Sequence, residues 1–295
     1  MHLVLTARGL QGYRQGTLPE TGPAVAGLPS VRSASVRSMV AIGAHVDSSD
    51  PLTAAAVIGA SAAQFFLADP QGWKKPVEHT HAAEIRASDL AIYIHAPYIV
   101  NVATTNNRIR IPSRKILSQH AAAAAGIGAK GLIVHGGHVG SDAELDTGFV
   151  NWHKVFQREQ FPLPILIENT AGGNHAIARR FDRLARLWDA VGEFGVGFCL
   201  DTCHAHTGGE DLADVVDRVM AITGRIDLVH ANNSRDEFDS GADRHANFDV
   251  GTIDAAQIAA VAAAAGSDVI VETPGQGHAA DIAYLREHLP AGSTS

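Results

Sequence analysis

An imidazole follows a carboxylate at the end of an apolar run in the segment GVGFCLDTCHAHTGG, residues 195–209. Asp201 closes the run, and His204 lies three residues further along the chain. A carboxylate and an imidazole this close can bind a metal ion, act as an acid–base pair, or be neighbours by coincidence. The segment alone does not distinguish these interpretations, but the rest of the chain repeats the pattern.

Chemically similar side chains end six consecutive apolar runs of the sequence. In chain order these are His95, His135, Glu168, Asp201, His230 and Glu272. His204 and the segment DRHAN, with Asp243 and His245, bring the number of such residues to nine. One histidine at a strand end is commonly structural, whereas six successive runs that end in imidazole or carboxylate are difficult to attribute to chance.

The chemistry of these side chains indicates a metal site with more than one ion. Imidazole nitrogens and carboxylate oxygens together suit zinc, manganese or iron. The nine residues exceed what one ion with about four to six ligands can accept, and they fit two or three ions. Asp201 and His204 need not share an ion, because a short turn can direct them to neighbouring ones.

Eight apolar runs of strand length alternate with helix-like segments from Met39 onward. They are residues 40–46, 63–68, 91–96, 131–136, 163–169, 195–201, 226–232 and 268–273. Each run is almost continuously apolar and rich in Val, Ile or Leu, which is typical of parallel strands that are covered on both faces. Eight strand-then-helix units predict an α/β fold, a single (β/α)8 barrel of the TIM type.

Two of the intervening segments, residues 112–128 and 174–195, show helical patterns. The second spaces apolar side chains three and four residues apart, starting with Ile177 and Phe181, and ends at a glycine, as expected of a helix C-cap. A doubly wound open sheet is the alternative fold, but it usually has fewer strands and a glycine-rich nucleotide fingerprint, which the sequence lacks. In a TIM barrel the active site lies at the carboxyl ends of the strands, so the nine side chains are expected to converge.

Composition is consistent with one large globular barrel. The 295 residues are 46% hydrophobic and 18% charged, and no apolar run approaches the length of a membrane span. The formal net charge of −8 argues against nonspecific binding of nucleic acid, although bound divalent cations would offset part of it. The two cysteines, Cys199 and Cys203, exclude a disulfide framework and favour a reducing, cytoplasmic location. We expect a monomer.

Residues 1–38 differ from the remainder of the chain. They are rich in Gly, Pro, Ser and Arg and show no sustained periodicity, so we predict a disordered or irregular extension before a barrel domain of residues 39–295. The segment lacks both the apolar core of a signal peptide and a convincing amphipathic helix. The alternative is that translation starts at Met39 and that the preceding codons are upstream reading frame.

Six motifs give the sequence a family resemblance. YIHAPY, IVHGGH, LIENTAGG, CLDTCHAHTGG, VHANNSRDEFDSGADRHAN and VIVETP resemble the successive motifs of the endonuclease IV family of apurinic/apyrimidinic (AP) endonucleases. The resemblance extends from Met39 to about Leu289. It implies a (β/α)8 barrel with three zinc ions that repairs double-stranded DNA containing abasic sites. The reaction implied is hydrolysis of the phosphodiester 5′ to the abasic site, leaving a 3′-hydroxyl and a 5′-deoxyribose phosphate.

The resemblance also assigns the ligands of each ion. It implies that one zinc is bound by His95, His135 and Glu168, a second by Glu168, Asp201, His230 and Glu272, and the third by His204, Asp243 and His245. Glu168 would bridge the first two ions, and Glu168 and Glu272 would act catalytically by orienting the attacking hydroxide. Asp201 and His204 would thus serve different ions.

DNA contacts are expected from loops at the mouth of the barrel. Tyr98 matches a family position that contacts DNA, although packing on the barrel rim explains it equally well. The loop ADPQGWKKP, with Gln71 and Trp73, matches a second inserting segment, but Gln71 stands where some relatives carry arginine. Asn233 and Asp249 also depart from the family pattern, at positions close enough to influence the site.

Several residues near the motifs invite assignment as further ligands. His138 and His206 are expected to lie around the ligands or at the surface rather than to bind metal. Cys203 is expected to be a small buried thiol, because the ligand sets are complete without it. His45, which ends the first run, is expected to line the pocket.

Two other functions are compatible with a barrel of this kind. Xylose-isomerase-like sugar isomerases and epimerases share this barrel and use one or two divalent ions, but they have no need of the set His204, Asp243 and His245. A non-catalytic protein that binds damaged DNA would be expected to have lost ligands, and none is lost.

Overall fold

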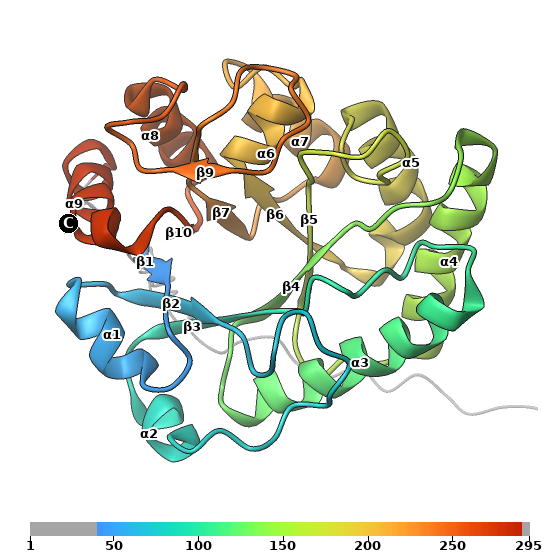
Figure 1. Ribbon diagram of the computed structural model, residues 1–295, viewed down its shortest axis with the longest axis horizontal. Coiled ribbons are helices and arrows are strands. Elements are labelled where there is room, and N and C mark those ends of the chain that lie inside the picture. The colour runs from blue at the N-terminus through green and yellow to red at the C-terminus, as the bar shows by residue number, and fades with distance from the viewer. Residues whose placement is uncertain (1–39, 291–295) are drawn as a thin grey trace, which may run out of the picture. The chain divides into compact units, whose positions relative to one another are not determined.

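The computed structural model describes residues 40–290, so the prediction for residues 1–38 lies outside the described residues. Eight parallel strands form a closed barrel (Figure 1). They are β1 (Ile42–His45), β2 (Ala62–Phe65), β3 (Ala91–His95), β4 (Gly131–His135), β5 (Ile165–Glu168), β6 (Gly197–Asp201), β7 (Leu228–His230) and β10 (Asp268–Val271). Each pairs with its neighbours in chain order, and β10 pairs with β1 to close the ring. The predicted (β/α)8 barrel is confirmed.

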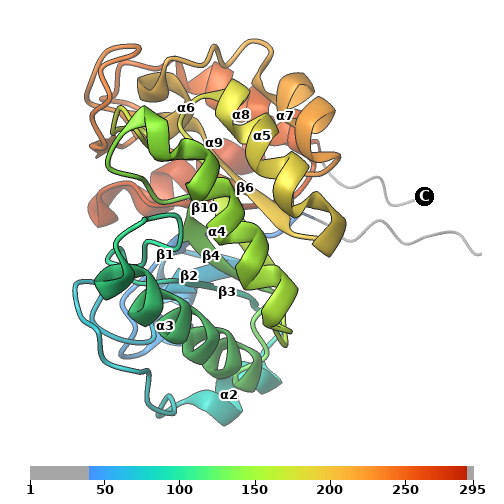
Figure 2. The same cartoon turned by 90° about the vertical axis from the view of Figure 1, so that its right-hand side faces the viewer.

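Helices follow the strands and lie outside the barrel (Figure 1). They are α1 (Pro51–Val57), α2 (Ala82–Ala87), α3 (Asn107–Gly126), α4 (Leu145–Arg158), α5 (Phe181–Val191), α6 (Thr202–Gly208), α7 (Val215–Thr223), α8 (Ala255–Ala265) and α9 (His278–His288). Figure 2 shows α3, α4 and α5 side by side over the strands. Two short antiparallel strands, β8 (Asn233–Ser234) and β9 (His245–Ala246), interrupt the alternation between β7 and α8. Among residues 40–290, no helix combines the length and apolar character needed to cross a bilayer.

Two helices start elsewhere than the sequence-based prediction has them, and α5 ends at Val191, where a short 3-10 turn continues the chain to Gly195. α5 begins at Phe181 rather than at residue 174, because the preceding segment pairs with the loop after β4: the N–H of Ile177 donates to the carbonyl of Gly137 at 2.9 Å. α3 begins five residues before Pro112, where the side chain of Asn106 caps it. Pro112 therefore lies inside the helix instead of at its start.

The interior of the barrel holds a layer of apolar side chains, one from each of seven strands. Its members are Ala62, Tyr93, Ile133, Leu166, Cys199, Leu228 and Ile270, all buried. A Cβ atom on Gly197 would lie 2.3 Å from Cδ2 of Leu166, so this glycine leaves the space that the leucine fills. A larger cluster of apolar residues packs the helices against the outside of the strands.

A polar layer lies directly above this apolar one. Inward-facing positions recur at every second residue of a strand, so each residue two places further on faces the same interior, nearer the carboxyl ends. From Gly43 of β1 and the seven apolar residues, this spacing leads to His45, Gln64, His95, His135, Glu168, Asp201, His230 and Glu272. The period of the strands thus gathers the predicted ligands at one end of the barrel.

Candidate metal centre

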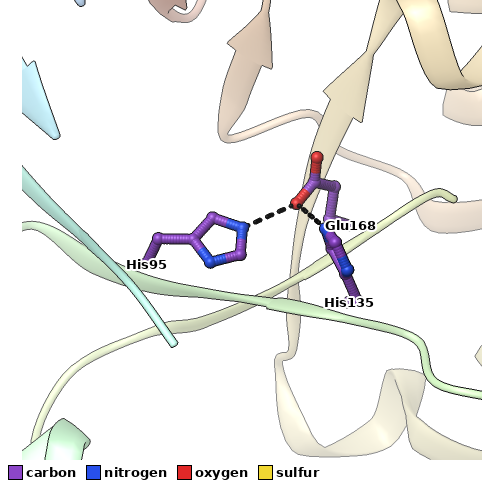
Figure 3. Close-up of side chains that lie close together, drawn as sticks. All are labelled: His95, His135 and Glu168. Atoms are coloured by element: carbon purple, nitrogen blue, oxygen red, sulfur yellow. Dashed lines mark hydrogen bonds and ion pairs between the residues drawn. The ribbon is translucent and has the colours of Figure 1, made fainter. Parts of the chain in front are cut away.

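The first cluster joins three neighbouring strands, β3, β4 and β5. Oε2 of Glu168 lies 3.1 Å from Nε2 of His95 and 3.3 Å from Nε2 of His135 (Figure 3). Glu168 is fully buried and His95 nearly so. Potential ligand atoms of the three residues all lie within 4.8 Å of one another. In Figure 3 the second oxygen of Glu168 points away from both histidines.

That second oxygen belongs to another cluster, formed by Glu168, Asp201, His230 and Glu272. Nδ1 of His230 lies 3.0 Å from Oε1 of Glu168 and 3.2 Å from Oε2 of Glu272. Asp201 and His230 face each other as partners in the β6–β7 register. The two oxygens of one buried carboxylate therefore serve two clusters, which is the geometry required of a bridging ligand.

The third cluster consists of His204, Asp243 and His245. Oδ1 of Asp243 lies 3.1 Å from Nε2 of His204 and 3.3 Å from Nε2 of His245. His204 is placed by local structure, because the side chain of Asp201 caps α6 by accepting the N–H of His204 at 2.7 Å. Asp201 and His204 thus belong to separate clusters although they lie on one turn.

The segment that carries Asp243 is tied to the loops beside it through Asp239. The Asp239 carboxylate accepts from Arg180 at 2.6 Å and from Arg179 at 3.1 Å. The backbone N–H groups of Asp239 and Gly241 donate to two carbonyls near the end of α6, at 3.0 and 2.8 Å. Asp239 has a φ of +59°, in the left-handed region that non-glycine residues seldom adopt. These contacts hold a strained turn against the helix that supplies His204.

Charge in the buried part of the site is balanced between carboxylates and histidines. Burial would raise the pKa of Glu168, but His230 and His135 lower it well below its usual range. Burial raises the pKa of Asp201. Burial would lower the pKa of His204, but Asp201 and other carboxylates raise it well above its usual range. The carboxylates therefore require positive charge close by, which a divalent cation supplies without protonating the histidines.

The unpaired atoms of the site also suit a cation. Nε2 of His204 and Nε2 of His245 are buried, and although both lie close to Oδ1 of Asp243, neither forms a hydrogen bond with any described residue. The opposite ring nitrogens donate to backbone carbonyls: Nδ1 of His204 to Asn169 at 2.9 Å, and Nδ1 of His245 to Glu272 at 3.2 Å. Such a bond selects the tautomer whose free nitrogen faces the cluster, as in metal-binding histidines. His95 is held in the same way, with Nδ1 donating to the carbonyl of Ala96 at 2.7 Å.

Cys203 lies within the same range of Asp201 and His245 as the other potential ligands. Burial raises the pKa of its thiol to about 12, and only a thiolate is a strong metal ligand. Cys203 is buried, as predicted. Its raised pKa favours the protonated thiol, so its closeness to Asp201 and His245 does not make it a strong ligand.

Three supporting residues were missed by the sequence-based prediction. Asn232 donates to Oδ2 of Asp201 at 2.6 Å, and Asn169 brackets the backbone of Asp201 with bonds of 2.8 and 2.9 Å. Gln64 contacts two members of the second cluster. The signal was present: each asparagine lies within two residues of a predicted ligand, and Gln64 is the sole polar residue of its apolar run.

Two of the three predicted DNA contacts lie beside the clusters. Tyr98 is 49% exposed, and its ring centroid lies 5.4 Å from that of His95 and 5.7 Å from that of His135. Tyr98 and Trp73, which is 45% exposed, line one cavity of about 550 Å³ that His135 and Asp243 also border. Gln71 is exposed on the loop between β2 and α2 but does not line this cavity.

A second cavity, of about 630 Å³, is also lined by Tyr98 and is bordered by Glu272 and His245. His45 lines it and lies 3.4 Å from Oε1 of Glu272. Both cavities therefore border members of the clusters, and Tyr98 lines both. His45 thus lies where the sequence analysis expected it.

The remaining residues of interest lie outside the clusters. The imidazole of His138 contacts the amide of Asn101 at 3.2 Å, and neither His138 nor His206 belongs to a potential ligand group among the described residues. Asn233 is buried, and its amide donates to two backbone carbonyls of the loop 248–253. Asp249 is exposed. Asn233 therefore organises a loop next to the third cluster rather than facing the centre.

The fold and the clusters define a class of protein, a (β/α)8 barrel with a candidate polynuclear metal centre at the carboxyl ends of its strands. Residues 52–288 match the family model described as a xylose isomerase-like TIM barrel. The chain is 57% identical over 246 residues to the probable endonuclease 4 of Mycobacterium bovis (strain BCG / Pasteur 1173P2), covering 83% of this chain and 98% of that protein. It is 56% identical over the same length to the probable endonuclease 4 of Mycobacterium leprae (strain Br4923), with equal coverage.

A comparison with solved structures finds the same family. Endonuclease IV from Thermus thermophilus matches with a TM-score of 0.72 at 27% identity, over 84% of this chain and 98% of that one. The chain belongs to the endonuclease IV family of DNA-cleaving hydrolases, and the resemblance of its motifs is confirmed. A D-tagatose 3-epimerase-like protein matches with a TM-score of 0.69 at 18% identity, over 84% of this chain and 96% of that one, which shows the shared fold alone.

Proposed function

We propose that this enzyme hydrolyses the phosphodiester 5′ to an abasic site in double-stranded DNA, leaving a 3′-hydroxyl and a 5′-deoxyribose phosphate, with three bound zinc ions. The observation that supports this most strongly is the third cluster, His204, Asp243 and His245, beside two clusters that share Glu168. A sugar epimerase needs one or two ions, so a third ligand set favours phosphodiester chemistry, in which charge develops on several oxygens at once.

The residues present fit zinc. The first site would take His95, His135 and Glu168, the second Glu168, Asp201, His230 and Glu272, and the third His204, Asp243 and His245, all with nitrogen or oxygen donors. Bound zinc supplies Lewis-acid charge next to the phosphate and lowers the pKa of water toward neutrality.

Two glutamates of the centre are suited to handle the attacking water. Glu272 borders the larger cavity, and its side chain is 12% exposed, whereas Glu168 is fully buried. Burial would raise the pKa of Glu272, but His230 lowers it well below its usual range, so the carboxylate is ionised and can accept a hydrogen bond from water. Glu272 therefore orients the water directly, and Glu168 fixes the spacing of the first two sites.

Exposed side chains around the two cavities would bind the DNA. Trp73 and Tyr98 present aromatic faces next to the clusters, where they can stack on bases or insert beside the lesion. Gln71, on the same loop as Trp73, would contact the DNA backbone. A duplex is easily distorted where a base is missing, so recognition through shape requires few base-specific contacts.

The proposal is tested by incision of a duplex that carries one synthetic abasic site, with the full chain and a matched undamaged duplex. Bound metal is counted in the same preparation, and sedimentation tests the expected monomer. Cleavage at the lesion alone, with about three zinc ions per chain, is the expected result. Epimerisation of a ketose without incision would replace the proposal by the sugar-epimerase function. DNA as substrate implies action in the cytoplasm, at the nucleoid.

A further inference from the structure

Gln64 is a buried amide inside the barrel, near the carboxyl ends of the strands, and none of the sequence motifs includes it. It lies on β2 in the same inward-facing layer as the ligands, and its exposed fraction is zero. Its amide nitrogen lies 2.6 Å from Oε1 of Glu272 and 3.0 Å from Nδ1 of His45. Its amide oxygen lies 2.8 Å from Nε2 of His230. One neutral side chain therefore contacts two members of the second cluster.

The neighbours leave the amide only one orientation. A carboxylate such as Glu272 accepts hydrogen bonds, so the NH2 group of Gln64 must face it. The carbonyl oxygen of Gln64 then faces His230 and can only accept, so Nε2 of His230 must carry a proton. Both amide hydrogens are used, one by Glu272 and the other by His45.

This arrangement determines which nitrogen of His230 is free. In the neutral imidazole a proton on Nε2 leaves a lone pair on Nδ1, and Nδ1 is the atom that faces Glu168 and Glu272 at 3.0 and 3.2 Å. In His95, His204 and His245 a backbone carbonyl accepts from Nδ1 instead, which leaves Nε2 free to face the cluster. Among the described residues, no backbone carbonyl accepts a hydrogen bond from the ring of His230, and the amide oxygen of Gln64 takes that place.

We propose that Gln64 is a positioning residue for the second cluster: its amide holds His230 as the Nε2–H tautomer and holds Glu272 in place, so that Nδ1 of His230 and Oε2 of Glu272 meet. The inference rests on the proposed function for the bound zinc and for the effect on catalysis, but not for the hydrogen bonds of Gln64. A residue that supports a metal-binding histidine typically changes metal affinity or activity by about 10- to 100-fold when it is lost.

The test compares Gln64→Leu, which keeps the size but removes both hydrogen-bonding groups, with Gln64→Glu, which keeps an acceptor for His230. Gln157→Leu makes the same exchange at an exposed site on α4 and serves as the control. Zinc affinity is measured by competition with a chelator, and the tautomer of His230 by ¹⁵N NMR of histidine-labelled, zinc-free protein, in which no metal holds Nδ1. The kcat and KM for abasic DNA are measured alongside.

For Gln64→Leu we expect the zinc of the second cluster to bind about 10- to 100-fold less tightly, kcat to fall by a similar factor, and KM to change by less than about twofold. The Nε2–H signal of His230 should be lost in Gln64→Leu and restored in Gln64→Glu, while Gln157→Leu matches the parent protein. Unchanged zinc affinity and an unchanged His230 tautomer in Gln64→Leu would overturn the proposal. Equal loss of every zinc together with a large fall in Tm would also overturn it, since Gln64 would then support the fold in general. If Gln64→Leu does not fold, the proposal is tested with Gln64→Glu alone. Retention of the Nε2–H signal of His230 in that variant supports the proposal, and loss of the signal contradicts it.

Neither the zinc affinity nor the tautomer depends on the substrate. If the parent protein does not incise abasic DNA, the proposed function fails while the role of Gln64 is still measured.

Discussion

Oε1 of Glu168 lies 3.0 Å from Nδ1 of His230, on the side of the carboxylate opposite to the first cluster. The two residues lie on β5 and β7, with β6 between them, and both are fully buried. The contact therefore links the first cluster, which β3, β4 and β5 supply, to the second cluster, which includes residues of β6 and β7. Loss of this one carboxylate is expected to affect both.

Glu168→Gln removes the negative charge from both clusters while preserving the size of the side chain. We expect bound zinc to fall by about two ions per chain and incision of abasic DNA to fall at least about 100-fold, since a ligand matters at least as much as the residues that support it. Metal is counted by mass spectrometry after dialysis. Glu159→Gln, at a partly exposed glutamate 3.9 Å from Arg114, is the control. A Glu168→Gln protein with full metal and full activity would refute the bridging assignment.

Asp239→Asn keeps a residue that tolerates the left-handed conformation but weakens the ion pairs with Arg179 and Arg180. Because these pairs hold the segment that carries Asp243, we expect the third zinc to be released to a chelator about fivefold faster, the equivalent of about 1 kcal/mol. Asp142→Asn breaks a similar exposed pair with Arg183, away from the third cluster, and should release zinc at the parental rate. Equal rates in the two variants would show that the Asp239 contacts do not retain the metal.

Trp73→Ala and Tyr98→Ala remove the aromatic faces beside the metal clusters. We expect each to weaken binding of abasic duplex by about 1–3 kcal/mol, the range for the loss of a base–aromatic stack, with metal content unchanged. Fluorescence anisotropy with a labelled duplex measures the affinity. Phe194→Ala, at an exposed aromatic residue beyond the end of α5, should bind normally. Parental affinity in Tyr98→Ala would favour the alternative that this tyrosine only packs on the rim.

His120 gives the fold a dependence on pH outside the metal centre. It is fully buried in α3, neither ring nitrogen has a hydrogen-bond partner among the described residues, and burial lowers its pKa from 6.5 to about 4. The unfolded chain therefore takes up this proton at higher pH than the folded chain does. The neutral histidine contributes its full stability above about pH 6.5, and this contribution is lost as the pH falls toward 4.

Between about pH 8 and pH 5 the loss from His120 is expected to be about 2 kcal/mol in the free energy of unfolding. Urea denaturation of the parent protein and of His120→Leu at both pH values measures this contribution. The contributions of the other histidines cancel when the free energies of unfolding of the two proteins are subtracted. His120→Leu should lose less stability on acidification than the parent does. The prediction would be contradicted if the free energies of unfolding of the two proteins differed by the same amount at both pH values.

Much of the fold was predictable because the relevant signals are local. Each of the eight apolar runs coincides with one barrel strand to within a few residues, since run length and β-branched content depend on neighbouring residues only. The start of α5 was predicted wrongly, because the bond between Ile177 and Gly137 joins segments 40 residues apart and overrides a helical pattern. Gln64 was missed for a related reason: a lone glutamine in an apolar run acquires meaning only when its neighbours across the barrel are known.

The amino-acid order alone places the ligand types. A strand alternates its faces every two residues, so a polar residue two places beyond an inward-facing apolar one must reach the same interior, whatever the other strands do. The division of those ligands into clusters depends instead on closure of the barrel and on the register of non-adjacent strands, which set the separations between side chains. That is why Glu168 and His230, 62 residues apart, lie in contact. Asp201 and His204, three residues apart, face different clusters because Asp201 ends β6 while His204 lies beyond the strand, on α6.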